Sequence, residues 1–188
     1  WKRASPNEQA PRATQGLADY VRACGGAERG VCIAFDSRKF SDVFAREVAC
    51  VLAANGISAF LFDALRPVPL LSGTVPLLGC AAGVVITASH NPAKYNGYKV
   101  YWEDGGQAAP ERAAAIFERI QDTPMFAAKT MDFDAAVEAG LIRIVGAAED
   151  EAYYRAAEQL LTYPELVRRH GGELPIVYTP LNGSGNMP

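Results

Sequence analysis

Short apolar runs alternate with longer amphipathic segments along this chain of 188 residues, and this alternation restricts the fold more than any other feature. The runs at 31–35, 57–62 and 83–87 have the length of strands and are almost wholly apolar. Such runs are typical of strands buried on both faces. The segments between them carry apolar residues at helical spacing. The alternation therefore predicts an α/β domain of three layers, with helices on both faces of a sheet.

The segment 41–55 shows the helical pattern most clearly. Ser41 occupies an N-cap position, and Gly56 follows as a C-terminal stop. A second helix is predicted at 14–24, ahead of Gly25 and Gly26. The apolar stripe predicted for the helix at 41–55 consists of Val43, Phe44, Val48, Val51 and Leu52.

A fourth strand is predicted at 98–102, where Lys99 lies among large apolar residues. Only a short loop separates this strand from the one at 83–87. So brief a connection permits an antiparallel partner but not a parallel crossover, so the sheet is expected to be mixed and mostly parallel. A helix is predicted at 110–121, and a short one within 68–80.

The pattern weakens after residue 123 and then changes. A helix is predicted at 150–161, a short strand at 175–178, and a glycine-rich loop directly after it. A strand that delivers such a loop normally feeds a helix. We therefore expect a first domain at 1–148 and the truncated start of a second, similar domain at 149–188.

Composition excludes several classes of function. The net charge is −3, with 49% hydrophobic and 21% charged residues, so no broad basic surface is expected to bind nucleic acid. The apolar runs are too short to span a membrane, and no apolar signal segment follows the N-terminus. The four cysteines lack C-x-x-C spacing, which favours buried free thiols in the cytoplasm over disulfides or a zinc site.

Residues 87–92, Thr-Ala-Ser-His-Asn-Pro, follow the third strand at the edge where open α/β sheets bind ligands. A hydrolase serine would need G-x-S-x-G and a base within reach. Neighbours in an extended chain point to opposite sides, so His90 is expected to be badly placed to deprotonate Ser89. The simplest alternative is a turn rich in cap-forming residues, in which Asn91 and Pro92 are the turn-forming pair.

The wider context favours a third interpretation. The run TASHNP, followed by KYNGYKVY at 94–101, resembles the phosphoserine loop of the α-D-phosphohexomutases, the phosphoglucomutase and phosphomannomutase family. Phe35-Asp36-Ser37-Arg38 resembles that family's D-x-R element. The run YTPLNGSG at 178–185 is similar to the entry of its second domain. The resemblance implies the family's first domain and the start of its second, a portion expected to be inactive alone.

The resemblance also implies a phosphoryl-transfer cycle. Ser89, as phosphoserine, would convert glucose or mannose 1-phosphate and 6-phosphate through a sugar bisphosphate, with Mg²⁺ bound to the phosphate on Ser89. The catalytic residues beside Ser89 would be Arg38, Lys99 and His90. Arg38 would bind phosphate oxygens. Lys99 would act as an acid or base, because its strand is expected to return it toward Ser89. Asn91 and Thr87 would bind substrate. A solvated arginine or lysine and a structural histidine remain the simpler alternatives.

The chain departs from the family pattern in several places. Neither the initial G-T-x-G-x-R-G strand nor the D-G-D-G-D-R metal loop is found, and Asp132-Phe133-Asp134 is interpreted as an exposed acidic pair. The run WEDGGQ at 102–107 resembles a branch with phosphopentomutases and sugar-bisphosphate synthases. A non-catalytic module that binds phosphosugars and a structural or assembly domain are the rivals from other classes. His170, beside two glycines, is expected to be a cap or surface residue.

Overall fold

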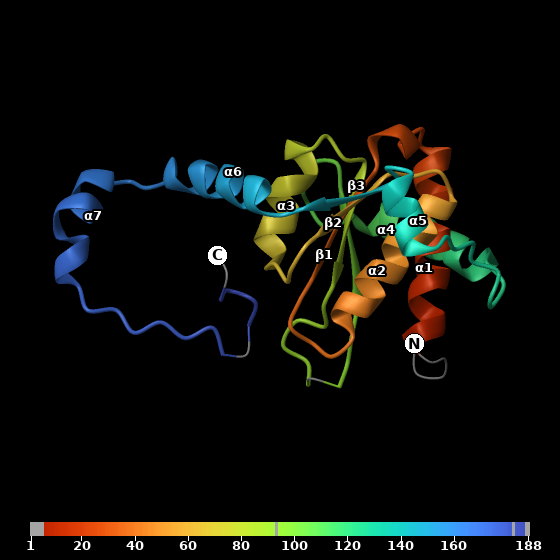
Figure 1. The fold of residues 1–188 in the computed structure, drawn as a ribbon, viewed down its shortest axis with the longest axis horizontal. Helices are drawn as coiled ribbons and strands as arrows, with labels where there is room; N and C mark the ends of the chain where they lie inside the picture. Colours follow the sequence, from red (N-terminus) through yellow and green to blue (C-terminus); the bar gives the residue numbers. More distant parts are fainter. Residues whose placement is uncertain (1–5, 93, 182, 187–188) are drawn as a thin grey trace.

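The computed structural model describes residues 6–92, 94–181 and 183–186. A five-stranded sheet with the order β4-β3-β1-β2-β5 forms the centre of the molecule (Figure 1). Helices cover both of its faces, and a C-terminal arm extends away from it (Figure 1). The mixed, mostly parallel sheet predicted from the sequence is therefore confirmed.

The three central strands are buried because almost every side chain in them is apolar. They are β1 (Val31–Phe35), β2 (Ala59–Phe62) and β3 (Ala82–Ile86). Both β2 and β3 pair parallel to β1. Since parallel strands end at one edge of the sheet, the segments after β1 and β3 are brought together there.

The strand β4 (Tyr98–Trp102) pairs antiparallel with β3, as the short connection predicts. Its register joins Tyr98 to Ile86 and Trp102 to Ala82. At the opposite edge, β5 (Ile142–Val145) pairs parallel with β2. The sequence pattern did not indicate β5, because Arg143 interrupts a run of only four residues.

One face of the sheet is covered by four helices, which enclose the larger apolar cluster. They are α1 (Pro6–Ala23), α2 (Ser41–Ala54), α4 (Pro110–Asp122) and α5 (Phe133–Glu138). On the other face, α3 (Val68–Leu77) encloses a smaller cluster, and α6 (Ala147–Glu158) lies against α3 (Figure 1). The chain continues through α7 (Pro164–His170), and single 3₁₀ turns lie at Ala27–Arg29 and Gly171–Glu173.

The helix boundaries correct three predictions. The first helix begins at Pro6 rather than residue 14, and α6 begins at Ala147 rather than residue 150. The N-cap of α2 is Phe40, in a left-handed conformation with φ 64°, and not Ser41. Val43 is 43% exposed, whereas the other members of the predicted stripe are buried.

The strand predicted at 175–178 is not formed. This segment is coil, and Val177 is 99% exposed. A strand requires a partner for its backbone groups, and no partner strand lies beside this segment among the described residues. A short apolar run alone is therefore insufficient to form a strand.

The cysteines follow the expectation of free thiols among the described residues. Cys32 and Cys80 are buried, Cys50 is half-buried and Cys24 is exposed. Burial raises the pKa of the Cys80 thiol to about 12, because the thiolate would lose its solvation. The same cause raises the pKa of Cys32. Both groups therefore stay neutral at physiological pH.

None of the described helices combines the length and the apolar character of a membrane-crossing segment.

The α2 stripe gives a direct test of core packing. Leu52 is fully buried, so Leu52→Ala should lower the free energy of unfolding by about 3 kcal/mol through lost burial and the cavity left behind. The matched variant Val43→Ala, on the exposed side of the same helix, should change it by less than about 0.5 kcal/mol. Denaturant unfolding of both variants measures the difference; equal losses would contradict the assigned packing of α2.

Candidate active site

The site lies where β1 and β3 end side by side. The backbone N–H of Asp36, the first residue after β1, donates to the carbonyl oxygen of Ile86, the last residue of β3, at 3.2 Å. The loop that follows β1 therefore lies against the loop that joins β3 to β4. We call residues 87–97 the Ser89 loop.

Arg38 holds the Ser89 loop in place through its guanidinium group. Its side chain is only 10% exposed, and its Nε donates to Asp36 Oδ2 at 3.1 Å. Its two Nη atoms donate to four carbonyl oxygens of the loop: those of Ser89 (2.6 Å), Asn91 (2.6 Å), Pro92 (2.9 Å) and Tyr95 (2.9 Å). A guanidinium has five N–H groups, and these five bonds engage all of them.

This geometry gives Arg38 contacts that the sequence did not suggest. The sequence suggested that its fork of donors binds phosphate oxygens, but no N–H of the group remains free in this arrangement. The surface alternative is also wrong, because the side chain is largely buried. Arg38 instead fixes the backbone that carries Ser89.

Asp36 completes this arrangement. Its Oδ1 accepts from the backbone N–H of Arg38 at 3.0 Å and from the hydroxyl of Ser41 at 2.8 Å. The Ser41 hydroxyl also lies 2.9 Å from Asn96 Oδ1, while Asn96 Nδ2 donates to the carbonyl of Lys39 at 2.8 Å. Ser41, which the sequence suggested as an N-cap, thus joins the two loops.

Ser89 lies at the exposed turn of its loop in a left-handed conformation, with φ 55°. Its backbone N–H donates to Thr87 Oγ1 at 3.1 Å. Non-glycine residues adopt this conformation rarely, and such residues often cluster at functional sites. The conformation turns the chain sharply and presents the Ser89 hydroxyl at the surface.

The same turn corrects the prediction for His90. In an extended chain the two neighbouring side chains would diverge, but here His90 Nδ1 lies 3.4 Å from Ser89 Oγ. This distance is long for a hydrogen bond and becomes a good one after a shift of a few tenths of an ångström. The imidazole is therefore close enough to exchange a proton at Ser89 Oγ or at an oxygen bound beside it.

Gly97 allows the loop to return closely past its own start. A Cβ atom placed there would lie 2.5 Å from the carbonyl oxygen of Thr87. The backbone N–H of Thr87 in turn donates to the carbonyl of Gly97 at 3.0 Å. Any side chain at position 97 would separate the two ends of the Ser89 loop, which explains the need for glycine.

Ser89 opens onto a hollow of about 570 Å³ at this edge of the sheet. Among the described residues, the hollow is lined by Asp36, Ser37, Arg38, Thr87, Ser89, His90, Asn91, Pro92, Gly183 and Ser184. Five of the six predicted site residues are therefore brought together. The last two lining residues come from the glycine-rich segment near the C-terminus, whose Asn182 lies outside the described residues.

Lys99 is the predicted site residue that does not line this hollow. It pairs with Val85, one residue in from the end of β4, and lines a separate hollow of about 190 Å³ beside Ala13 and Ile116. The antiparallel return was predicted correctly, but its register places Lys99 within the sheet, opposite Val85, and not at the end of β3 where the Ser89 loop begins. Its role as acid or base stays a prediction.

Asn91 and Thr87 support the loop from within. Asn91 Nδ2 donates to the carbonyl of Ala88 at 3.0 Å, and Thr87 is 6% exposed with its hydroxyl bound to the Ser89 N–H. Their contact with a substrate stays a prediction. His170, expected at the surface, is exposed and lies 3.1 Å from Glu173.

The described residues do not make a magnesium site by themselves. Asp36 is the only carboxylate among the described residues lining the hollow, and both its oxygens accept hydrogen bonds. In the described part of the chain, no group of three His, Cys, Asp or Glu side chains is suited to a metal ion. Asp132 and Asp134 are exposed, as expected, and Asp132 caps α5 by accepting from the N–H of Ala135.

Comparison with known proteins agrees with this geometry. A family model described as phosphoglucomutase/phosphomannomutase, alpha/beta/alpha domain I, matches residues 5–127. The chain belongs to the phosphoglucomutase/phosphomannomutase family. The matched region contains α1 to α4, β1 to β4 and the Ser89 loop.

The chain is also similar in sequence to individual proteins of known name. A phosphoglucomutase of Staphylococcus saprophyticus is 39% identical over 171 residues, covering 86% of this chain and 31% of the relative. A probable phosphoribomutase of Schizosaccharomyces pombe is 45% identical over 112 residues, covering 58% of this chain and 19% of the relative. The chain thus spans less than a third of the length of these relatives.

A solved structure supports the fold directly. The crystal structure of a putative phosphomannomutase from Thermus thermophilus superimposes with a TM-score of 0.74 at 28% identity. The match covers 88% of this chain and 34% of that chain. The α/β architecture is therefore that of the phosphoglucomutase/phosphomannomutase family.

Arg38→Lys tests whether the guanidinium holds the Ser89 loop. A lysine keeps the charge but cannot reach four carbonyl oxygens and Asp36 at once, so hydrogen exchange of residues 87–97 should become about tenfold faster. The control Arg29→Lys alters an exposed arginine that pairs with Glu103, and should leave this exchange unchanged. Wild-type protection of the loop in Arg38→Lys would disprove the assignment. Hydrogen-exchange mass spectrometry measures both variants.

Proposed function

We propose that this chain is the phosphoserine-bearing part of a phosphohexomutase. The whole enzyme would be an intramolecular phosphotransferase that interconverts the 1-phosphate and 6-phosphate of glucose or mannose through a sugar bisphosphate. The observation that carries the proposal is the position of Ser89, in a left-handed turn fixed by Arg38 and open to the hollow. Membership of the family agrees with this chemistry.

The proposed cycle needs one carrier oxygen, which is Ser89 Oγ. The bond between Ser89 Oγ and phosphorus breaks as a free hydroxyl of the sugar monophosphate forms its own bond to that phosphorus. The proton of the sugar hydroxyl passes to a base, and His90 is the nearest imidazole to Ser89 Oγ. The bisphosphate then turns end for end and returns its other phosphoryl group to Ser89 Oγ. Each turn of the cycle thus regenerates phosphoserine.

The fixed loop contributes by orientation. Phosphoryl transfer depends on placing the attacking and leaving oxygens in line, and a rigid Ser89 loop supplies half of that alignment. In this proposal Arg38 acts on the loop backbone and does not contact the phosphate. Lys99 would take part only after a rearrangement that brings its amine toward Ser89, so we place it behind His90 as the proton acceptor.

Magnesium belongs to the proposal as a partner of the phosphate on Ser89. The ion supplies positive charge to the transferring phosphoryl group when bound. The phosphate oxygens would be the ligand that this chain offers, because the Asp36 carboxylate already accepts hydrogen bonds from Arg38 and Ser41. We further propose the cytoplasm as the compartment, sugar phosphates and a sugar bisphosphate as ligands, and no nucleic-acid or membrane partner.

A pentose phosphate is the second candidate substrate. Besides the probable phosphoribomutase, a phosphopentomutase of Mus musculus is 37% identical over 119 residues, covering 59% of this chain and 19% of the relative. These similarities keep open the branch that the run at 102–107 resembles. Rates with glucose, mannose and ribose 1-phosphates would rank the alternatives.

Ser89→Ala in the full-length protein tests the carrier role. Incubation with glucose 1,6-bisphosphate should add one phosphoryl group to the wild type, seen by intact-mass spectrometry, and none to Ser89→Ala. Mutase turnover should fall by at least about a thousandfold, since the cycle loses its only carrier oxygen.

Ser37→Ala is the matched control, because Ser37 is another serine that lines the same hollow. This variant should still be phosphorylated at Ser89. Phosphorylation that persists in Ser89→Ala, or a wild type that binds the bisphosphate without becoming phosphorylated, would contradict the proposal. The latter result would favour the non-catalytic phosphosugar-binding module.

A further inference from the structure

The helix α6 leaves the α/β core with few attachments. It contains no fully buried side chain, although it lies along α3 (Figure 1). One close contact joins them: a Cβ placed on Gly73 of α3 would lie 2.9 Å from the ring of Tyr153. After α6 the chain runs outward through α7 and then turns back toward the core (Figure 1). The orientation of α6 therefore depends on a small number of interactions.

The strongest of these interactions is a buried ion pair between Arg66 and Asp150. Arg66 Nε lies 2.8 Å and 3.0 Å from the two carboxylate oxygens of Asp150, and Arg66 Nη2 lies 2.8 Å from Oδ2. The Arg66 side chain is 2% exposed and that of Asp150 is 14% exposed. The hydrogen bonds to Asp150 raise the pKa of Arg66, so the guanidinium stays charged. Because two nitrogens of the guanidinium bind the carboxylate, the pair fixes the orientation of Asp150 relative to Arg66 as well as the distance between them.

Arg66 is also bonded to the end of β1, beside the site. Its backbone N–H donates to the carbonyl of Phe35 at 3.0 Å, and the next residue after Phe35 is Asp36, which holds Arg38. Beside Arg66, the carboxylate of Asp63 lies so close to Gly146 that a Cβ there would be only 2.8 Å from it. The loop after β2 therefore packs against both the strand end beneath the Ser89 loop and the start of α6.

We propose that Arg66 and Asp150 are positioning residues that set the direction in which the chain leaves the α/β core and so place residues 183–184 over the hollow at Ser89. Gly183 and Ser184 line that hollow, and α6 is the last helix packed on the core before them. A rotation of α6 about its start would be amplified along the arm that follows. The predicted boundary between residues 148 and 149 lies beside this joint, and Asp150 connects the two sides of it.

Asp150→Asn in the full-length protein tests the inference. Asparagine has nearly the same shape but no charge, so Arg66 loses its bidentate partner. Hydrogen exchange of residues 147–158 should become about tenfold faster, while that of β1 and of residues 87–97 should stay as in the wild type. Catalytic efficiency, kcat/KM, should fall about tenfold because the closing segment is misplaced. Asp150→Glu, which keeps the charge, should recover part of both properties.

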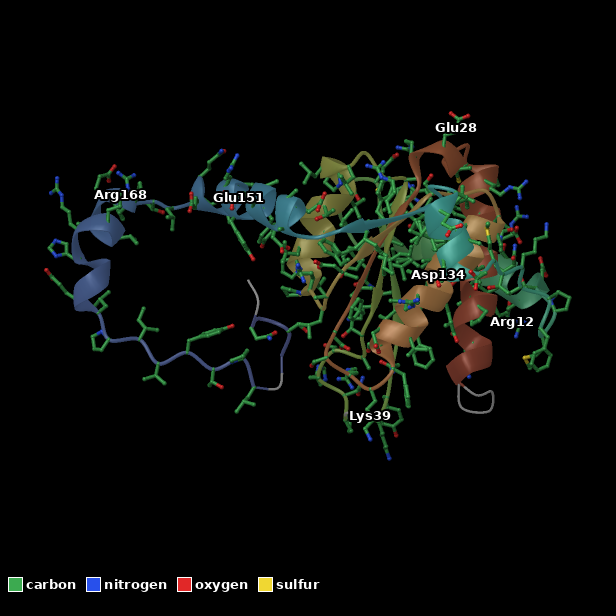
Figure 2. The ribbon with its side chains drawn as sticks, in the orientation of Figure 1. Arg12, Glu28, Lys39, Asp134, Glu151 and Arg168 are labelled. Atoms are coloured by element: carbon green, nitrogen blue, oxygen red, sulfur yellow. The ribbon has the colours of Figure 1, made fainter. Side chains whose placement is uncertain are left out.

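Glu151→Gln is the matched control on the same helix (Figure 2). Glu151 pairs with Arg155, but the two side chains are 59% and 72% exposed, so the loss of this pair should change neither exchange nor kcat/KM. Unchanged protection of α6 in Asp150→Asn, or full kcat/KM with a mobile α6, would overturn the inference. Faster exchange in β1 as well would reduce the pair to a general stabilising contact and would also overturn it.

The kinetic half of this test rests on the proposed function, whereas the exchange half does not. Failure of the proposed function would appear as a wild type without turnover. Failure of the present inference would appear as an α6 that is equally protected in Asp150→Asn and in the wild type.

Discussion

The arrangement of this site depends on the hydrogen bonds that the guanidinium group of Arg38 donates. This group joins the segment after β1 to four carbonyl oxygens of the Ser89 loop, and Asp36 fixes the guanidinium from its other side. A left-handed serine is an unfavourable conformation that persists only where its surroundings determine it. Here three residues determine it. Arg38 donates all its N–H groups, the hydroxyl of Thr87 accepts from the Ser89 N–H, and Gly97 lets the two ends of the loop lie close together. The position of Ser89 is thus fixed by contacts to the backbone of its own loop.

Much of the fold was predictable because its core strands are short, apolar and buried on both faces. The antiparallel return of β4 followed from the length of the connection alone, whatever its side chains. The sequence was a poor guide where an element depends on its partner. Ile142–Val145 becomes a strand because β2 offers an unpaired edge, whereas 175–178 has a better strand pattern and no strand beside it among the described residues.

The sequence indicated which of these residues would lie together, but not what each of them contacts. The motif and its position after a strand indicated Ser89, His90 and Asn91, and the structure brings them into one hollow. The role of Arg38 was not readable, because its acceptors are backbone oxygens more than fifty residues along the chain. Arg66 was missed for a similar reason: its partner Asp150 lies 84 residues away, and neither residue belongs to a motif. A D-x-R spacing suggests a charge but does not identify what that charge binds.

The backbone conformation of Ser89 has a consequence for the choice of hydroxyl. Threonine offers the same oxygen, yet its branched Cβ makes a φ near 55° strongly unfavourable. Aspartate and asparagine tolerate that region far better, so an aspartate at position 89 would fit the turn more easily than a threonine. The backbone conformation therefore restricts which residues can occupy position 89, whatever the reactivity of their side chains.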